Sequence, residues 1–237
     1  MKIEVSQLAQ NIDQELLQKF IEAGVFYGRK KALTSPKMKE YLINLPTLGN
    51  IEIFNLDKTK ELLDRAAQFM SKLIKEGEKI LFVGTKPAAN YVKEVANFLG
   101  QYWITFRWPG GFLTNFVTIK SRIDFLKSLE EKIKSGEIEK YPPKEKIAMQ
   151  REYEKLIKMY EGVKDMERLP GAIFIVDLSF KNHKTAHREA LKMKIPIIAI
   201  CGSDNDPEGV EYIIPANDKA PRSIKFLLDY LKESIKI

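Results

Sequence analysis

The stretch FVGTKP, residues 82–87, places a glycine and a lysine between a short apolar run and the start of a helix. Nucleotide-binding proteins use this order. However, the phosphate loop also needs four residues between two glycines and a Lys-Ser/Thr pair, and the dinucleotide fingerprint needs three spaced glycines. Gly84 stands alone, so the sequence argues against a nucleotide pocket. The N–H groups of a helix N-terminus beside Lys86 can still hold one phosphate, which could belong to RNA. The alternative is an ordinary turn between a strand and a helix.

Two patterns suggest a metal site, and both are incomplete. The stretch DNDPEG, residues 204–209, starts like a calcium-binding loop, but the twelfth loop position is Pro215 instead of Glu. An Asp/Pro/Gly turn is the better interpretation. His183 and His187 have the spacing of zinc proteases, which also need a Glu directly after the first His. That position is Lys184, so we expect two exposed helix residues and no metal.

No side chain stands out as a carrier of catalysis. The sequence has no nucleophile elbow or Ser–His motif, and no pair among its many Asp and Glu residues is singled out. The single cysteine, Cys201, excludes a disulfide framework and a Cys-rich zinc site. It lies in the apolar run IPIIAIC, where a small buried residue is expected. We therefore expect neither a catalytic residue nor a cofactor.

The stretch GVFYGRKKALTSPKMKEY, residues 24–41, mixes basic and aromatic side chains, with Glu40 as its one acid. Such mixing suits contact with phosphates together with stacking on bases or riboses. The aromatic residues are Phe26, Tyr27 and Tyr41. The basic residues are Arg29, Lys30, Lys31, Lys37 and Lys39. The alternative is a solvated basic loop.

The stretch FRWPGGFLTNF, residues 106–116, combines glycines with large aromatic side chains. Arg107 can pair with a phosphate, and two glycines allow the backbone to approach another surface closely. The aromatic residues supply contact area, partly in the protein's own core. They are Trp108, Phe112 and Phe116. We expect this stretch to anchor the structure and to contact RNA.

The bulk properties agree with a partner that is a polyanion. A formal charge of +7 over 237 residues favours nucleic acid, although an enzyme with an incidental basic balance is the alternative. No apolar run approaches the roughly 20 residues of a membrane helix. The N-terminal MKIEVSQLAQ lacks the apolar core of a signal peptide. These features favour the cytoplasm and exclude a membrane partner.

Short apolar strands alternate with helices along most of the chain. Continuous Ile, Val and Phe runs separated by helices are typical of an α/β fold with a parallel sheet covered on both faces. Strands are expected at 41–45, 51–56, 79–83, 102–105, 172–176, 197–201 and 212–214. Helices are expected at 13–23, 87–99, 182–193 and 220–234, and from an N-cap at Asp57 to a stop at Gly77.

Between Thr118 and Tyr160 the alternation stops, and almost half of the residues are charged. Apolar side chains recur at spacings of three and four on both sides of a Gly/Pro-containing break. Such narrow seams are typical of two helices that pack as an antiparallel coiled coil. The seam residues are Ile119, Ile123, Leu126, Leu129, Ile133, Met149, Tyr153, Leu156 and Tyr160. We expect one α/β domain from residues 1–117 and 162–237, with a protruding hairpin at 118–161.

Six motifs, in order and at matching spacing, resemble those of the bacterial-type family of small-subunit ribosomal protein two. They are AGVFYG (23–28), PKMKEY (36–41), ILFVGTK (80–86), RWPGGFLTN (107–115), VKDMERLPG (163–171) and IIPANDKAPRSI (213–224). The resemblance runs from about Leu17 to the C-terminal helix. It implies a Rossmann-like, flavodoxin-like parallel sheet with a protruding coiled-coil hairpin.

The resemblance also implies a place between the head and body of the small subunit. There the family binds small-subunit rRNA and neighbouring ribosomal proteins, helps to dock the large mRNA-binding protein one, and supports assembly and translation. Together with the basic stretches, this predicts RNA contacts through Arg29, Lys30, Lys31, Lys37, Lys39, Lys86 and Arg107. Structural or interface roles are predicted for Tyr27, Trp108, Gly110, Gly111 and Asn115.

Several positions depart from the family pattern. Phe26 and Arg29 stand where the family has two histidines, so contacts that need those histidines are not expected. Pro109 replaces a leucine, and Thr34-Ser35 replaces Trp-Asn. Gly202 begins the segment Gly-Ser-Asp-Asn, where the family favours Asp-Thr-Asn.

Two classes of function are therefore compared. The first is a non-enzymatic structural protein of the small ribosomal subunit. The second is a Rossmann-like enzyme that uses a nucleotide or a phosphorylated substrate. The single glycine after the strand at 79–83 disfavours the enzyme, and we predict the ribosomal protein.

Overall fold

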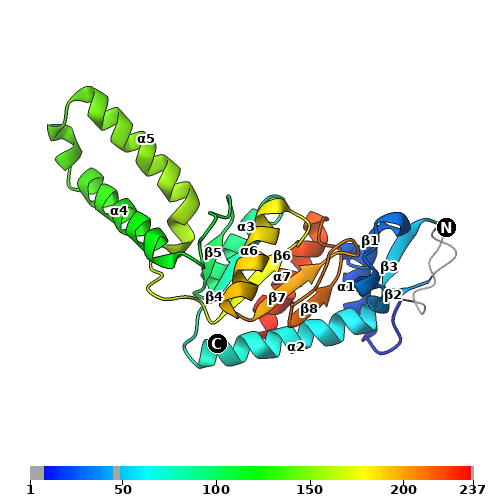
Figure 1. Cartoon of the computed structure of the whole chain (residues 1–237). Coiled ribbons are helices and arrows are strands. Elements are labelled where there is room, and N and C mark those ends of the chain that lie inside the picture. Colours follow the sequence, from blue (N-terminus) through cyan, green and yellow to red (C-terminus); the bar gives the residue numbers. More distant parts are fainter. Residues whose placement is uncertain (1–7, 45–48, 236–237) are drawn as a thin grey trace.

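A five-stranded parallel sheet forms the centre of the computed structural model, which describes residues 8–44 and 49–235 (Figure 1). The strand order is β5-β4-β6-β7-β8. The strands are β4 (Ile80–Val83), β5 (Tyr102–Ile104), β6 (Ala172–Val176), β7 (Ile197–Cys201) and β8 (Tyr212–Pro215). Every residue of β4, β6 and β7 is buried, as a sheet covered on both faces requires. The prediction of a Rossmann-like α/β fold is confirmed.

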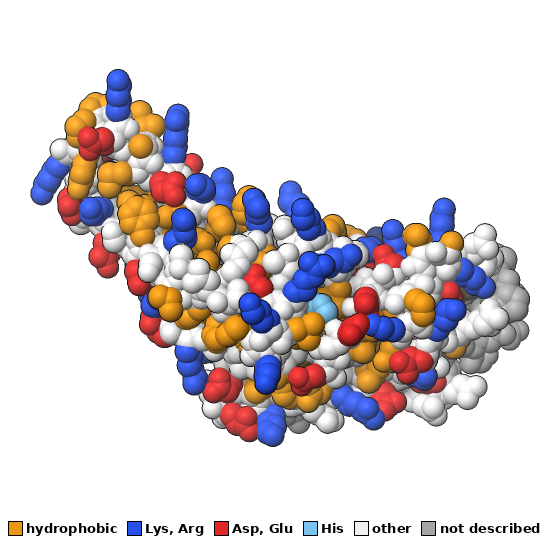
Figure 2. Space-filling model, viewed as in Figure 1, with side chains coloured by type: hydrophobic (Ala, Val, Ile, Leu, Met, Phe, Trp, Pro, Cys, Tyr) orange, Lys and Arg blue, Asp and Glu red, His pale blue; other side chains and the backbone are white. Residues whose placement is uncertain are grey.

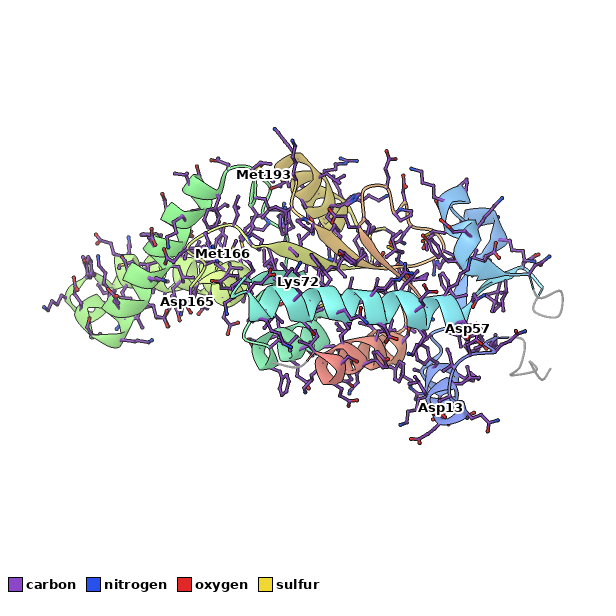
Figure 3. All side chains as sticks on the ribbon, turned by 90° about the horizontal axis from the view of Figure 1, so that it is seen from below. Asp13, Asp57, Lys72, Asp165, Met166 and Met193 are labelled. Carbon is purple, nitrogen blue, oxygen red and sulfur yellow. The ribbon has the colours of Figure 1, made fainter. Side chains whose placement is uncertain are left out.

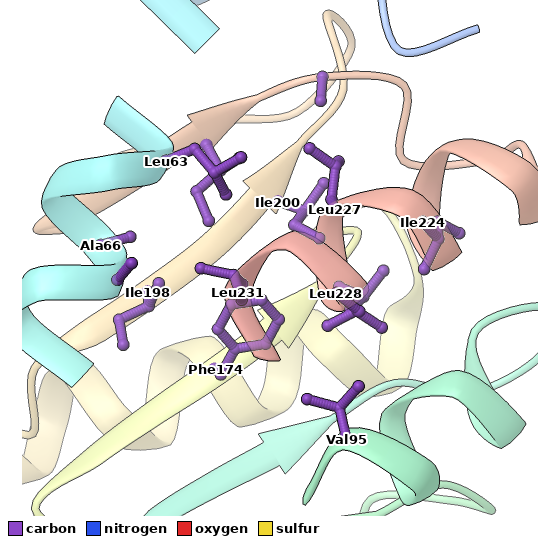
Figure 4. Packing of buried hydrophobic residues seen from close by; sticks show 14 of the residues in the cluster. Leu63, Ala66, Val95, Phe174, Ile198, Ile200, Ile224, Leu227, Leu228 and Leu231 are labelled. Carbon is purple, nitrogen blue, oxygen red and sulfur yellow. The ribbon is translucent and has the colours of Figure 1, made fainter. Parts of the chain in front are cut away.

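Helices cover both faces of this sheet. On one face, Phe174 of β6 and Ile198 of β7 pack with side chains of three helices (Figure 4). These helices are α2 (Leu56–Lys75), α3 (Ala89–Phe98) and α7 (Pro221–Ser234). On the other face, Ile173 and Ile175 share a second apolar cluster with α6 (Lys181–Met193). None of the helices in the described part of the chain is both long and apolar enough to span a membrane.

Hydrogen bonds connect the segment that precedes helix α1 to the start of helix α2. α1 (Gln14–Ala23) begins after Asp13, whose side chain accepts hydrogen bonds from two backbone N–H groups of the first turn, and ends at Gly24 in the left-handed region. The predicted N-cap of α2, Asp57, is wrong, because the Asn55 side chain caps this helix. Asp57 instead accepts hydrogen bonds from the N–H groups of Gln10 and Asn11, at 2.8 and 2.9 Å. Figure 3 marks Asp57 at this end of α2.

A small antiparallel sheet lies at one end of the molecule (Figure 1). Its order is β1-β3-β2, from β1 (Tyr27–Lys30), β2 (Leu42–Ile43) and β3 (Ile51–Phe54). Strands β2 and β3 confirm the two predicted strands in shorter form, while part of the turn predicted at 46–50 lies outside the described residues. β1 was not predicted, because YGRK lacks apolar alternation. Short 3-10 helices, η2 (Lys31–Leu33) and η3 (Pro36–Tyr41), follow β1.

Two long helices project from the opposite end of the molecule, side by side and antiparallel (Figure 1). They are α4 (Phe116–Lys134) and α5 (Pro143–Tyr160), joined through η5 (Glu137–Lys140). α4 begins two residues before the predicted hairpin boundary. Six of the predicted seam residues are buried. They are Ile119, Ile123, Leu126, Leu129, Leu156 and Tyr160. They belong to the cluster that covers β4 and β6, so the base of the hairpin is continuous with the core.

A buried polar cluster joins the carboxyl ends of β6, β7 and β8. Asp177 follows β6, and its carboxylate accepts hydrogen bonds from the Lys219 ammonium and the Ser179 backbone N–H. Asn205, after β7, accepts from the N–H of Leu178 at 2.7 Å and donates to Asp218 at 3.1 Å. Gly202 is necessary here, because an added Cβ would lie 2.4 Å from an oxygen of Asp218. This departure from the family pattern therefore makes room for a buried acid.

The two acids of this cluster differ in charge state. Burial, and then the neighbouring charge of Asp177, raises the pKa of Asp218 to about 8. Burial opposes ionisation of Asp177 too, but hydrogen bonds from Lys219 and Ser179 hold its pKa below the usual value. The cluster therefore holds one charged and one protonated carboxyl group at neutral pH.

The first prediction concerns a glycine at the base of the hairpin. A Cβ at Gly162 would lie 2.1 Å from Trp103 Cδ2 and 2.3 Å from the Trp103 carbonyl oxygen. Gly162→Ala should therefore lower the free energy of unfolding by about 1–3 kcal/mol or more, measured by urea denaturation. Gly110→Ala is the control, because its Cβ would meet no atom within 4 Å. Equal effects of the two substitutions would contradict this packing.

The second prediction concerns Asp218. The folded state keeps its proton up to about pH 8, whereas the unfolded carboxyl loses it near the ordinary Asp value of 3.8. Folding thus takes up a proton between these values, and this contribution to stability is lost as pH rises through that window. Asp218→Asn mimics the neutral acid and should become more stable relative to the natural chain as pH rises. Urea denaturation from about pH 5 to about pH 8 measures this difference; a difference independent of pH would refute the assignment.

Candidate nucleic-acid interface

The basic segment, residues 24–41, contains a strand followed by two 3-10 helices, and hydrogen bonds fix it to the large sheet. The N–H of Arg29 donates to Ser203 Oγ at 2.7 Å, and the N–H of Ser35 donates to the Ser203 carbonyl at 2.8 Å. Gly28 allows this approach, since an added Cβ would lie 3.0 Å from Ser203 Oγ and 2.9 Å from Glu52 Cβ. The segment therefore presents its side chains from a defined position.

The five cations of this segment divide into two groups. Arg29 lies 3.7 Å from Asp204, and Lys37 lies 3.1 Å from Asp206 and 2.5 Å from Glu208. Hydrogen bonds to Glu208 and then Asp206 raise the pKa of Lys37. The DNDPEG stretch is thus a turn that pairs with basic residues. Within residues 8–44 and 49–235, no acid forms an ion pair with the exposed residues Lys30, Lys31 and Lys39.

The aromatic residues of this segment offer less stacking surface than the sequence predicts. Phe26 is buried at 3% exposure, and its ring lies 4.0 Å from the ring of Tyr27. Tyr27 is 40% exposed and is available to a partner, whereas Tyr41 is half-buried. The prediction that Phe26 is one of the stacking residues is therefore wrong.

The loop at 106–116 is held by a residue that the sequence analysis missed. Glu189 of α6 is 8% exposed, and its Oε1 accepts from Trp108 Nε1 at 3.0 Å and from the Gly111 N–H at 2.8 Å. Its Oε2 accepts from the N–H of Leu113 at 2.9 Å and, more weakly, from that of Thr114 at 3.4 Å. The sequence did contain a sign that Glu189 is buried, because this acid shares the inward-facing side of the helix with Ala186 and Ala190.

The buried and the exposed residues of this loop fit different predicted roles. Trp108 is 3% exposed and packs on Phe112, at 5.0 Å between ring centroids. It therefore fits the structural role and not the interface role. Arg107, Gly110 and Asn115 are exposed, and Gly111 is half-buried in the left-handed region at φ 82°.

The remaining four predicted residues of the loop line a pocket of about 480 Å³ at the base of the hairpin. They are Arg107, Gly110, Gly111 and Asn115. Arg122 of α4 also lines the pocket, together with the ion-paired Lys155 and Glu152 of α5. A pocket with two guanidinium groups and bare glycine backbone suits a phosphate group.

Lys86 lies apart from the basic segment, beside α6. It is exposed, and the preceding Thr85 N–H donates to His183 Nε2 at 3.3 Å. Gly84 is explained by packing, because a Cβ there would lie 2.7 Å from Val92 of α3. α3 itself begins at Ala89, later than predicted.

The two histidines are not both exposed, as was expected. His183 is 1% exposed, and its Nδ1 bonds to the Asp177 carbonyl at 2.7 Å. Burial lowers the pKa of His183 and also that of the half-buried His187, whose Nε2 bonds to the Glu208 carbonyl. In the part of the chain that the structure describes, no three His, Cys, Asp or Glu side chains gather as a metal site would require.

The third prediction concerns the buried carboxylate. Glu189→Gln leaves one acceptor oxygen and directs an NH₂ group at donors that need an acceptor. The free energy of unfolding should fall by about 2–3 kcal/mol, measured by urea denaturation. Glu154→Gln on the exposed side of α5 is the control and should change it by less than about 0.5 kcal/mol. An equally small effect at Glu189 would show that the carboxylate does not hold the loop.

Comparison with known proteins agrees with these features. The family model described as "Ribosomal protein S2" matches residues 20–237. The chain is 42% identical over 221 residues to the small ribosomal subunit protein uS2 of Dictyoglomus thermophilum, covering 93% of this chain and 88% of that protein. The uS2 protein of Dictyoglomus turgidum matches with the same identity and coverage. This chain therefore belongs to the ribosomal protein S2 family of the small ribosomal subunit.

Proposed function

We propose that this structural, non-enzymatic component of the small subunit binds small-subunit rRNA through its basic segment and the loop at 106–116. The observation that carries the proposal is the fixed attachment of the basic segment to Ser203. It positions, on a rigid support, three cations that form no ion pair with an acid of residues 8–44 and 49–235. Fixed cations lose less conformational freedom when they meet a phosphate backbone, and phosphate contacts release counterions.

The predicted contacts have different weights in this proposal. Lys30, Lys31 and Lys39 contact phosphates directly, while Arg29 and Lys37 contribute less because acids of 204–208 share their charge. Lys86 contacts a phosphate beside α6, and Arg107 contacts a phosphate at the loop 106–116. Tyr27 offers a face for a base or ribose.

The loop pocket adds a second contact in this proposal. Arg107, Gly110, Gly111 and Asn115 take an RNA phosphate at the base of the hairpin, while Trp108 supports the loop from within. The glycines contribute backbone that no side chain covers.

The hairpin and the body act on different partners in this proposal. Residues 1–117 and 162–237 form the body, and the hairpin 118–161 packs as a coiled coil and reaches neighbouring ribosomal proteins. The family resemblance adds a position on the cytoplasmic ribosome between head and body, and roles in subunit assembly, translation and docking of protein one. The support from the structure is the projection of α4 and α5 away from the body (Figure 1).

The fourth prediction tests the basic segment. If about six phosphates are neutralised, affinity for bacterial small-subunit rRNA should fall roughly 10³-fold from about 50 to about 200 mM salt. Arg29→Ala, Lys30→Ala and Lys31→Ala together should weaken binding and leave the melting temperature nearly unchanged. Filter binding at several salt concentrations measures the affinity of both proteins for rRNA. Thermal denaturation measures their melting temperatures.

The matched control is Arg65→Ala, Lys72→Ala and Lys75→Ala on α2, which removes the same charge from a helix outside the basic segment. If the control weakens rRNA binding as much as the basic-segment variant does, only net charge matters and the assigned segment is wrong. Binding that does not respond to salt would reject the electrostatic contact altogether.

A further inference from the structure

Helix α6 presents a row of four basic side chains to solvent. Its buried face carries His183, Ala186, Glu189 and Ala190. The basic residues recur at spacings of three, four and four on the opposite side of the helix and are all exposed. They are Lys181, Lys184, Arg188 and Lys192. At about 1.5 Å of rise per residue the α6 row extends about 16 Å.

In residues 8–44 and 49–235, no carboxylate forms an ion pair with any cation of the α6 row, and Glu189 is the helix's one acid. The helices on the other face of the sheet differ. On α2, Lys60 and Arg65 pair with acids one turn away, and on α7, Lys225 does the same. The charge of the molecule is therefore uneven. Figure 2 shows Lys and Arg side chains along the face over α6, from the hairpin to the small sheet.

Nearby acids do not cancel the charge of the α6 row. One pocket of about 380 Å³ is lined both by Lys184 and Arg188 and by Asp204, Asp206 and Glu208. These three acids already pair with Arg29 and Lys37 of the basic segment. These three acids and their two partners, Arg29 and Lys37, leave only one net negative charge, so the four cations of the α6 row keep a positive field.

We propose that the α6 row is a further RNA-binding surface that follows a phosphate backbone of small-subunit rRNA. This inference rests on the proposed function and extends it to residues outside the predicted site. A line of separate cations matches a polyanion, which carries one charge per phosphate. A protein partner fits less well, because the buried centres of protein interfaces are depleted in Lys. Lys86 extends the surface, since its loop contacts α6 through Thr85 and His183.

The experiment replaces Lys184, Arg188 and Lys192 with Ala in the full chain. Alanine keeps the helix propensity high, and circular dichroism checks the fold. The probe is bacterial small-subunit rRNA, and its affinity is measured against salt concentration. Loss of three phosphate contacts should reduce the slope of log affinity against log salt by about 2 to 3, which is about a 10²-fold loss near 0.1 M salt. The α2 control triple should keep the slope of the natural chain.

The outcomes separate this inference from the proposed function. An unchanged slope in the α6 variant, with a reduced slope in the basic-segment variant, overturns the α6 surface alone. A natural chain that binds without salt dependence overturns both. Normal rRNA affinity of the α6 variant with poor incorporation into small subunits also overturns the inference, because the α6 row would then serve an acidic protein.

Discussion

The arrangement of the elements that we propose to bind RNA depends on the hydrogen bonds of the buried Glu189 carboxylate. An ionised carboxylate inside a protein is costly unless donors surround it. Here the indole of Trp108 and the N–H groups of Gly111 and Leu113 supply them at 2.8 to 3.0 Å. Because all these donors belong to one loop, satisfying the acid fixes the loop against α6.

This constraint connects parts of the chain that are distant in sequence. The fixed loop leads directly into α4, whose first turns share an apolar cluster with β4, β6 and α6. Helix α6 is therefore tied to the sheet, the loop and the base of the hairpin at once. Ser203 makes the corresponding attachment at the other end, between β7 and the basic segment. A member of the ribosomal S2 family can in this way present a hairpin and a basic face from one rigid body.

The central elements were predictable because their sequence pattern comes from burial itself. Strands β4, β6 and β7 are continuous apolar runs, and α1 carries both of its end signals, Asp13 and Gly24. Strand β1 was missed because its stability comes from pairing with β3 and from Ser203, which is 174 residues away from Arg29. The cap of α2 was misplaced since Asn55 and Asp57 are both good capping residues, and only the fold decides between them.

The candidate site was predictable in composition and not in geometry. The basic residues are visible in the sequence, but which of them are neutralised depends on contacts such as that of Lys37 with Asp206, 169 residues along the chain. Glu189 was not singled out, and Trp108 was predicted to serve both the core and an interface, because neither burial nor partners can be read from one short stretch. The α6 row was not predicted, because its importance lies in the ion pairs that its cations do not form within residues 8–44 and 49–235.

Native-state hydrogen exchange on the free chain measures the central constraint most directly. If the Glu189 carboxylate fixes the loop, the amides of Gly111 and Leu113 exchange only through large-scale opening, as slowly as amides in the middle of β6. Exchange of these two amides at the rate of an exposed turn, such as that around Gly209, would contradict the account. It would mean that the loop, and with it the base of the hairpin, is not held by the buried acid.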